Sequence, residues 1–360
     1  MQTIPTIRFE FIKRNLIFRF DAGTSRGVLK TKEVFWIKAF RESEPDLIGW
    51  GEAAPLVKLS PDDRPDFEQV LEKTLRDLEK ESWSMEEASI LEKVANLIPF
   101  ELPSIRFGVE TALLDLLNGG NQKIVSNPFY EKGLPIPING LIWMGSAEFM
   151  KQQIDEKLAQ GFHCIKMKIG AIDFEKELEL LHYIRSNYSA SEISLRVDAN
   201  GAFAPEEALS KLAALHQLDL HSIEQPIRSG QGEEMKKLCM ASELPIALDE
   251  ELIGVKDKAG LLDQINPPYI ILKPSLLGGI KETRAWISEA EKRGIGWWMT
   301  SALESNIGLN SISQLTSQYQ PSIPQGLGTG KLFHNNLNSP LTVREGNIYY
   351  EVEVPWELPS

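Results

Sequence analysis

Cysteine is nearly absent from this chain: Cys164 and Cys239 are the only two among 360 residues, and they lie far apart. Two distant cysteines form neither a disulfide framework nor a CxxC metal site, which is typical of a protein from a reducing compartment. No apolar run approaches the ~18–20 residues that a membrane-spanning helix needs. The first residues also lack the basic-then-apolar pattern of a secretion signal. We therefore expect a cytoplasmic protein without a membrane partner.

Clustered positive charge is absent as well. Lys and Arg number 38 against 51 Asp and Glu, which gives a net charge of −13 at pH 7, and no basic stripe occurs. Binding to phosphate backbones or to anionic membranes needs clustered cations. The composition therefore argues against nucleic acid as a partner.

The first 130 residues show strand patterns followed by helix patterns. Alternating apolar and β-branched residues predict strands over 6–20 and 34–39. The period becomes helical over 65–97 and again over 104–117, where Ser104 is a possible N-cap. Strands followed by helices indicate an α+β domain, which we assign to residues 1–130.

After about Leu134 a strand-like run followed by a helix-like run recurs about every 25–30 residues, a plausible length for a βα pair. The strand candidates are 136–143, 164–169, 194–200, 221–225, 246–250, 269–273, 296–301 and 325–328. Eight such units predict a parallel barrel over residues 131–330. The alternative is a doubly wound open sheet, but neither GxGxxG nor a Walker A loop follows the first strand. The remaining segment, 331–360, contains loop and strand patterns, and we expect it to return to the N-terminal domain.

Five consecutive barrel strands carry charge at or near their C-terminal ends, where a parallel strand covered on both faces should be apolar. One charged residue at a strand end is usually a solvated loop residue, but five strands with charge at one rim are not explained in that way. The segments are Lys166-Met167-Lys168, Arg196–Asn200, Glu224-Gln225-Pro226, Asp249-Glu250 and Lys273-Pro274. Active sites of barrel enzymes lie at this end of the strands, so we predict an active site there.

Alternation along each strand decides which of these side chains point into the barrel. Lys166 and Lys168 share one face of their strand, because the side-chain period is two. Arg196, Asp198 and Asn200 share a face of the next strand for the same reason. The apolar residues between them belong against the surrounding helices, so the charged set is expected inside the barrel.

Three carboxylates on adjacent strands, Asp198, Glu224 and Asp249, would repel one another without a cation. All-oxygen ligation suits Mg²⁺ or Mn²⁺ better than zinc, and no His or Cys occurs among the three. We therefore predict a magnesium site. Glu250 is the rival third ligand, but by alternation it points away from Asp249, which favours Asp249.

Lysines flank this predicted metal site on two sides. The strands that carry Lys168 and Lys273 are four apart in an eight-stranded barrel and so lie opposite each other. Nearby cations disfavour the ammonium form, so a lysine placed there can act as a base near neutral pH. Lys168 lies one pleat nearer the rim than Lys166, which makes Lys168 the better base and Lys166 its electrostatic neighbour. A metal and a second ammonium suit the two negative charges of an enediolate, which predicts proton removal next to a carboxylate.

The order and spacing of these segments resemble the enolase superfamily, muconate-lactonizing-enzyme subgroup, across most of the barrel. The resemblance implies a modified TIM barrel, (β/α)7β, behind an N-terminal α+β capping domain. It implies Lys168 as the base and Lys273 as the group that stabilises the enediolate from the other face. The implied Mg²⁺ ligands are Asp198, Glu224 and Asp249. Residues that would contact the substrate or orient the ligands are Arg196, Asn200 and Ser301.

Within the subgroup, residues 195–200, 300–308 and 326–330 are similar to the o-succinylbenzoate synthase family of menaquinone biosynthesis. That similarity implies dehydration of 2-succinyl-6-hydroxy-2,4-cyclohexadiene-1-carboxylate to o-succinylbenzoate, with a small-molecule carboxylate as partner. Dipeptide epimerases tend to carry an Asp-x-Asp pair after the last strand, and 326–330 has no carboxylate. An amino-group substrate is therefore disfavoured. An N-acylated amino acid is still compatible, so the alternative is an N-succinylamino acid racemase or another racemase or cycloisomerase of the subgroup.

Two further points stay open from the sequence. A barrel used only for binding is a third hypothesis, which the loss of a lysine or a carboxylate would favour, and none is missing. Loops over a barrel rim usually supply the lid, so 20–27 and 51–55 are lid candidates. The sequence leaves the oligomeric state undetermined.

Overall fold

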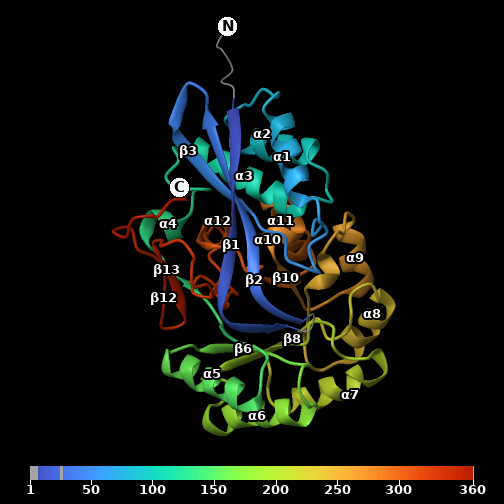
Figure 1. Ribbon diagram of the computed structural model, residues 1–360. Helices are drawn as coiled ribbons and strands as arrows, with labels where there is room; N and C mark the ends of the chain where they lie inside the picture. The colour runs from blue at the N-terminus through green and yellow to red at the C-terminus, as the bar shows by residue number, and fades with distance from the viewer. Residues whose placement is uncertain (1–6, 25–26, 360) are drawn as a thin grey trace.

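The computed structural model describes residues 7–24 and 27–359, and Figure 1 shows an N-terminal layer that rests on a larger barrel. The first three strands are β1 (Ile7–Thr24), β2 (Gly27–Arg41) and β3 (Glu44–Ala53), and they form an antiparallel meander. Figure 1 shows the long β1–β2 hairpin extending from this layer down to the barrel. The hairpin thus brings N-terminal residues to the barrel rim.

Three helices follow the meander: α1 (Phe67–Leu78), α2 (Glu87–Leu97) and α3 (Pro103–Leu117). Helix α3 packs on β2 and β3, and α2 packs on α3. The helical stretch predicted over 65–97 is therefore two helices. Their connection contains Trp83, whose buried indole nitrogen donates to the Leu78 carbonyl at 3.2 Å. Apolar residues recur with a helical period both before and after this turn. The sequence pattern therefore did not reveal the break between α1 and α2.

Helix α3 is the central element of the N-terminal domain, with every residue from Pro103 to Leu116 buried. Strand β3 lies so close to it that a Cβ atom on Gly51 would fall 2.0 Å from the Gly108 carbonyl oxygen. A Cβ atom on Gly49 would fall 2.2 Å from the Ala112 carbonyl oxygen. These glycines permit close packing of strand and helix, so the segment from Gly49 belongs to a strand rather than to a loop.

Seven parallel strands form the curled sheet of the second domain, in the order β11-β10-β9-β8-β7-β6-β5. They are β5 (Gly140–Ile142), β6 (Cys164–Lys168), β7 (Ser194–Asp198), β8 (Ser222–Glu224), β9 (Ile246–Leu248), β10 (Tyr269–Leu272) and β11 (Gly296–Met299). Single parallel bridges from Gln325 to Ile138 and from Gly326 to Thr300 join the two edges of this sheet. The predicted fold class, a modified TIM barrel (β/α)7β with an N-terminal α+β capping domain, is confirmed.

Helices surround the barrel, as the recurring sequence unit predicted. The helices after α3 are α4 (Pro128–Lys132), α5 (Ala147–Ala159), α6 (Phe174–Asn187), α7 (Pro205–His216), α8 (Gly232–Ala241), α9 (Lys258–Ile265), α10 (Pro274–Leu277), α11 (Ile280–Lys292) and α12 (Asn306–Ser317). None of the helices in the described ranges 7–24 and 27–359 has the length and apolar character needed to cross a membrane.

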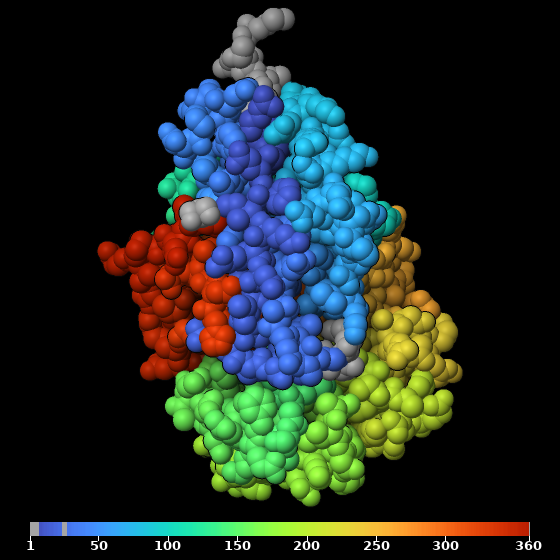
Figure 2. All heavy atoms as spheres, viewed as in Figure 1, coloured from blue at the N-terminus to red at the C-terminus, as the bar shows by residue number. Residues whose placement is uncertain are grey.

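The C-terminal segment contacts both domains. Strands β12 (Leu341–Arg344) and β13 (Asn347–Tyr350) form a small antiparallel sheet with β4 (Ile136–Pro137). The predicted strand 136–143 is therefore divided between this sheet and the barrel. Phe333 forms a bridge with Phe18 of β1, and Figure 2 shows the C-terminal segment, in red and orange, beside the blue N-terminal strands.

Two buried glutamates of the N-terminal domain bind the first turns of barrel helices. Glu52 of β3 accepts hydrogen bonds from the backbone nitrogens of Ser305 at 2.8 Å and Gly308 at 2.9 Å, at the start of α12. Glu110 of α3 accepts one from the backbone nitrogen of Ile280 at 2.5 Å, at the start of α11. Free N–H groups at a helix start need acceptor oxygens, which these two side chains supply. These contacts fix the N-terminal domain over the barrel.

Candidate active site

A cavity of about 230 Å³ lies at the C-terminal ends of the barrel strands. The predicted site residues that line it are Lys166, Lys168, Asp198, Asn200, Lys273 and Ser301. The N-terminal domain contributes Gly27–Leu29, from the start of β2, and Leu56–Lys58, just after β3. The cavity is therefore enclosed by both domains, where a barrel enzyme would bind its substrate.

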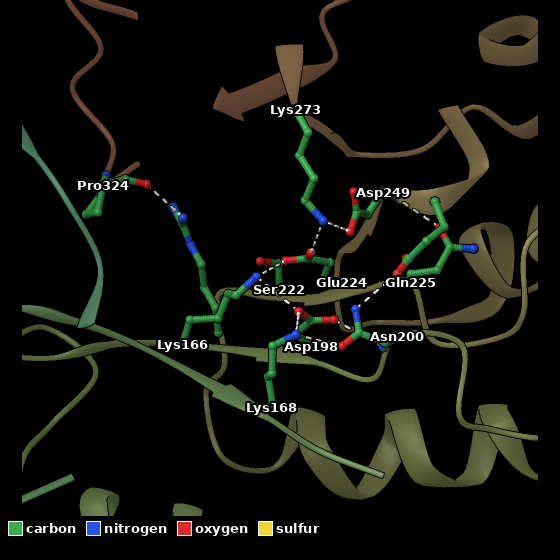
Figure 3. Close-up of polar contacts among 12 residues, drawn as sticks. Lys166, Lys168, Asp198, Asn200, Ser222, Glu224, Gln225, Asp249, Lys273 and Pro324 are labelled. Atoms are coloured by element: carbon green, nitrogen blue, oxygen red, sulfur yellow. Dashed lines mark hydrogen bonds and ion pairs between the residues drawn. The ribbon is translucent and has the colours of Figure 1, made fainter. Parts of the chain in front are cut away.

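Lys166 and Lys168 both project from β6 into the barrel, as the alternation predicted. The Nζ atom of Lys166 lies 2.5 Å from Oε2 of Glu224 and 3.1 Å from Oδ2 of Asp198. The Nζ atom of Lys168 lies 3.0 Å from the same Asp198 oxygen and donates to Oδ1 of Asn200 at 2.7 Å. Neighbouring strands thus place amine and carboxylate groups side by side, and Figure 3 shows these contacts.

Lys273 approaches the same carboxylates from the opposite side of the barrel. It follows β10, contacts Oδ2 of Asp249 directly, and lies 3.9 Å from Oε1 of Glu224. Figure 3 shows Lys273 and Lys168 on opposite sides of the carboxylates. A small molecule held between them would present one cationic group to each of its faces.

Burial and charge act in opposite directions on the ionisation of these groups. Burial lowers the pKa of Lys166, but the carboxylates of Asp198 and Glu224 outweigh it, so the pKa of Lys166 is raised. Burial and the neighbouring carboxylates likewise oppose each other at Lys273, whose pKa is also raised. We expected neighbouring cations to favour the neutral amine, and for these two lysines the carboxylates prevail instead. Both are therefore held as ammonium groups at neutral pH.

The carboxylates themselves differ in how well they are compensated. Burial raises the pKa of Asp198, but Lys166 and Lys168 outweigh it and hold that pKa below its ordinary value. Burial raises the pKa of Asp249, and the carboxylates of Glu250 and Glu224 add to this effect against the opposing charge of Lys273. Negative charge at Asp249 is therefore only partly balanced by the chain's own groups, and an added cation would balance it.

The donor set fits a divalent cation such as Mg²⁺ in its chemistry. Asp198, Glu224 and Asp249 offer only oxygen atoms, and Oε1 of Glu224 is buried without a hydrogen-bond partner among the described residues. Within the part of the chain that the structure describes, no three Asp, Glu, His or Cys side chains are already arranged to hold a metal ion. Lys166 and Lys273 instead lie against oxygens of Glu224 and Asp249.

Asp249 and Glu250, the two rival third ligands, take different partners. Asp249 faces Lys273, whereas Oε1 of Glu250 accepts a hydrogen bond from the side-chain amide of Asn200 at 3.1 Å. Glu250 opens a short 3-10 helix, η1 (Glu250–Leu252), directly after Asp249. The choice between them stays a prediction, which these contacts support in favour of Asp249.

Arg196 and Ser301 occupy very different positions. Arg196 is only 1% exposed, donates to the Pro324 carbonyl at 2.8 Å, and stacks 4.1 Å from the ring centre of Trp298. It lies one pleat deeper in the barrel than Asp198 and is not among the residues that line the cavity. Its position does not support the predicted substrate contact. Ser301 does line the cavity, and its hydroxyl donates to Glu304 at 2.6 Å.

Sequence reasoning missed part of the cavity lining. After β3 the chain contributes Leu56–Lys58, a few residues beyond the predicted lid segment 51–55, because Gly51–Ala53 belongs to β3. The other lid candidate, 20–27, reaches the cavity through Gly27, while its earlier residues are the end of β1 and residues 25 and 26 lie outside the described residues. Missed barrel residues include Leu141 and Trp143, which the predicted rim position of their strand could have revealed.

The chain is similar to known proteins in both sequence and fold. Residues 149–353 match the family model for enolase C-terminal domain-like proteins. The o-succinylbenzoate synthase of Desulfotalea psychrophila is 45% identical, over 94% of this chain and 98% of that protein. The crystal structure of MenC from the same organism matches with a TM-score of 0.85 and 42% identity, over 96% of this chain and 99% of that one.

A more distant match has a different activity. The substrate-liganded L-Ala-D/L-Glu epimerase of Bacillus subtilis has a TM-score of 0.81, over 98% of this chain and 97% of that chain. Its sequence identity is 22%, so this likeness shows the fold alone.

Proposed function

The chain belongs to the enolase C-terminal domain-like family, and from this membership we propose that it is an o-succinylbenzoate synthase. The enzyme is a carbon–oxygen lyase that dehydrates 2-succinyl-6-hydroxy-2,4-cyclohexadiene-1-carboxylate to o-succinylbenzoate, a step of menaquinone biosynthesis in the cytoplasm. The observation that carries the proposal is the near full-length 45% identity to such an enzyme. The opposed lysines of the cavity support it, because the reaction needs a base on one face of the substrate and a positive charge on the other.

In the proposed reaction Lys168 removes the proton next to the ring carboxylate. Its Nζ atom is held at the cavity surface by Asp198 and Asn200, so its reach toward a bound substrate is restricted to a small region. The electrons of the broken C–H bond form an enediolate with the ring carboxylate. Lys273 and Lys166, which the surrounding carboxylates hold as ammonium groups, supply positive charge against it.

The second half of the reaction expels the hydroxyl group. The enediolate electrons form the new ring double bond as the C–O bond breaks, and Lys168 returns its proton to the departing oxygen. The products are water and the aromatic dicarboxylate, so atoms and charge balance. A single lysine on one face can serve both steps if the proton and the hydroxyl leave from the same side.

Asp198, Glu224 and Asp249 are the proposed holders of Mg²⁺, for which Mn²⁺ could substitute. When bound, the cation supplies charge against the second negative charge that develops on the substrate carboxylate. The buried Oε1 atom of Glu224, which lacks a hydrogen-bond partner among the described residues, and the poorly balanced charge of Asp249 support this assignment.

The second candidate function is an N-succinylamino acid racemase, which the placement of Lys168 and Lys273 on opposite sides favours. Each lysine could serve one enantiomer. Incorporation of solvent deuterium into both enantiomers of an N-succinyl amino acid would support this activity.

The direct test is an assay for formation of the aromatic product from the cyclohexadiene substrate by its ultraviolet absorbance. We expect turnover with Mg²⁺ and none after chelation, with recovery when Mg²⁺ or Mn²⁺ is added back. Absence of product under all metal conditions, from a folded protein, would exclude the synthase assignment. Racemisation measured on the same preparation would then decide for the second candidate.

A further inference from the structure

Glu250 is a buried carboxylate next to the site for which the proposed reaction has no use. It is 8% exposed, and it is not among the residues that line the cavity. Its Oε1 atom accepts a hydrogen bond from Nδ2 of Asn200 at 3.1 Å. Asn200 does line the cavity, so Glu250 reaches the site through this amide.

The contact fixes which end of the Asn200 amide faces the proposed base. With Nδ2 directed to Glu250, Oδ1 is left facing Lys168, from which it accepts a hydrogen bond at 2.7 Å. The carboxylate of Glu250 offers only acceptors, and the amine of Lys168 donates to Oδ1, so the amide has one favourable orientation between them. Figure 3 shows Asn200 beside Asp198, the other acceptor of Lys168.

The backbone on both sides of Glu250 is itself braced. Oε1 of Gln225 accepts hydrogen bonds from the backbone nitrogens of Asp249 at 3.1 Å and Glu251 at 3.3 Å. Nε2 of Gln225 donates to the Ile227 carbonyl at 3.0 Å and to Glu251 at 3.2 Å. Gln225 and Asn200 both adopt positive φ, at 38° and 44°, a conformation that costs energy for residues other than glycine.

We propose that Glu250 and Asn200 form a positioning relay that holds Lys168 at the point where it meets the substrate proton. The inference rests on the proposed role of Lys168 as the base. It assigns Glu250 to the orientation of Asn200 rather than to metal binding. Asp198 and Asn200 then hold the Nζ atom of Lys168 from two directions. If the contact with Asn200 were lost, the Nζ atom would turn toward Asp198.

The test is a set of variants that change the hydrogen-bonding group at position 250. Glu250→Ala removes the acceptor, and we expect kcat to fall about 10²-fold, with KM within about threefold of the wild type, because only the base is displaced. Glu250→Gln keeps an acceptor oxygen and should retain at least about a tenth of wild-type kcat. Glu179→Ala, on the exposed face of α6, is the matched control.

A double variant makes the test independent of general disruption. Asn200→Asp alone places two carboxylates against each other and should be severely impaired. In the combination of Asn200→Asp with Glu250→Gln, the amide introduced at position 250 can donate to the carboxylate introduced at position 200. We expect this double variant to recover kcat by about tenfold or more over Asn200→Asp. Recovery requires that the two positions contact each other as the relay demands.

Two further measurements separate positioning from other roles. The primary deuterium isotope effect at the abstracted hydrogen should rise in Glu250→Ala, because proton abstraction becomes more rate-limiting. Direct calorimetric binding of Mn²⁺ should be unchanged within about threefold. An unchanged kcat in Glu250→Ala, lost Mn²⁺ binding, or a double variant no better than Asn200→Asp would each overturn the relay.

The proposed function can fail separately from the relay. If the wild-type protein forms no aromatic product, the same variants are compared by solvent deuterium exchange into N-succinyl amino acids, which also needs Lys168 as a base. The same rank order of variants would then support the relay without the synthase. An exchange rate that is unchanged in Glu250→Ala would refute the relay.

Discussion

The Nζ atom of Lys168 lies 3.0 Å from Oδ2 of Asp198, across the paired ends of β6 and β7. The same oxygen accepts from Lys166 at 3.1 Å. One carboxylate therefore contacts both the proposed base and its cationic neighbour. In the proposed mechanism it is also one of the three metal ligands. The arrangement makes the position of the base depend on the charge and orientation of Asp198.

Replacement of the proposed base should abolish chemistry while leaving the rest of the site intact. We expect Lys168→Ala to lower kcat by about 10³-fold or more, since a positioned general base contributes on that order. Product absorbance measures the loss, and calorimetry should still detect Mg²⁺ binding. Lys176→Ala, an exposed lysine of α6, is the control and should behave as wild type. Retention of most activity in Lys168→Ala would exclude it as the base.

Replacement of Asp198 should affect both metal binding and the base. Asp198→Asn keeps the shape of the side chain but removes the charge that Lys166 and Lys168 share. We expect weaker Mg²⁺ binding, by about tenfold or more, together with a loss of kcat of about 10²-fold or more that excess Mg²⁺ does not fully restore. Calorimetric titration and turnover at saturating metal separate the two effects. Full recovery at high Mg²⁺ would mean that Asp198 acts on the metal alone.

The convergence of these charged side chains inside the barrel was predictable, because the sequence breaks the rule for strands that are covered on both faces. Strands covered on both faces should be apolar, and Lys166, Lys168 and Asp198 break that rule at positions that alternate to one face. Register between parallel strands then brings Lys168 opposite Asp198, as observed. Periodicity gave the side that each residue faces but not its depth, which is why Arg196 was grouped with Asp198 although it lies deeper in the barrel.

The N-terminal domain was harder to predict in detail. A single helical period over 65–97 does not show a break such as the turn at Trp83, because both helices bury the same kind of face. The segment from Gly49 to Ala53 has little side-chain pattern, and its strand becomes evident only from the helix packed against it. Such features depend on tertiary contacts, which no local pattern records.

Close packing between β3 and α3 leads to a stability prediction. A Cβ atom on Gly51 would lie 2.0 Å from the backbone oxygen of Gly108, and backbone cannot move aside as a flexible side chain can. We expect Gly51→Ala to lower the free energy of unfolding by about 3 kcal/mol or more. Gly232→Ala, which meets only the side chain of Gln264 at 3.3 Å, is the control and should be nearly neutral. Urea unfolding measures both, and equal stability of the two variants would contradict the close approach.

Glu110 of α3, which accepts a hydrogen bond from the first turn of α11, makes the stability of the protein depend on pH. Burial raises the pKa of Glu110 to about 8, although the backbone of Ile280 and the charge of Arg106 oppose the shift and Glu282 adds to it. In the unfolded chain the same carboxyl titrates near 4.5. Between these two values the folded protein keeps a proton that the unfolded chain has lost. The stability supplied by this group is therefore fully present below about pH 4.5 and is lost as the pH rises to about 8.

Glu110→Gln isolates this effect, because it keeps an oxygen to accept from Ile280 and cannot titrate. We expect the free energy of unfolding of the wild type to fall relative to the variant by about 1.4 kcal/mol per pH unit between pH 5 and 8. Other buried carboxyls with raised pKa values, such as Glu52 at about 7, are common to both proteins and cancel in the difference. Urea unfolding at pH 5.5, 6.5 and 7.5 measures it, with the exposed Glu179→Gln as control. Parallel pH curves for wild type and Glu110→Gln would mean that Glu110 is already ionised in the folded protein, and that its contact with α11 is a charged cap instead of a protonated one.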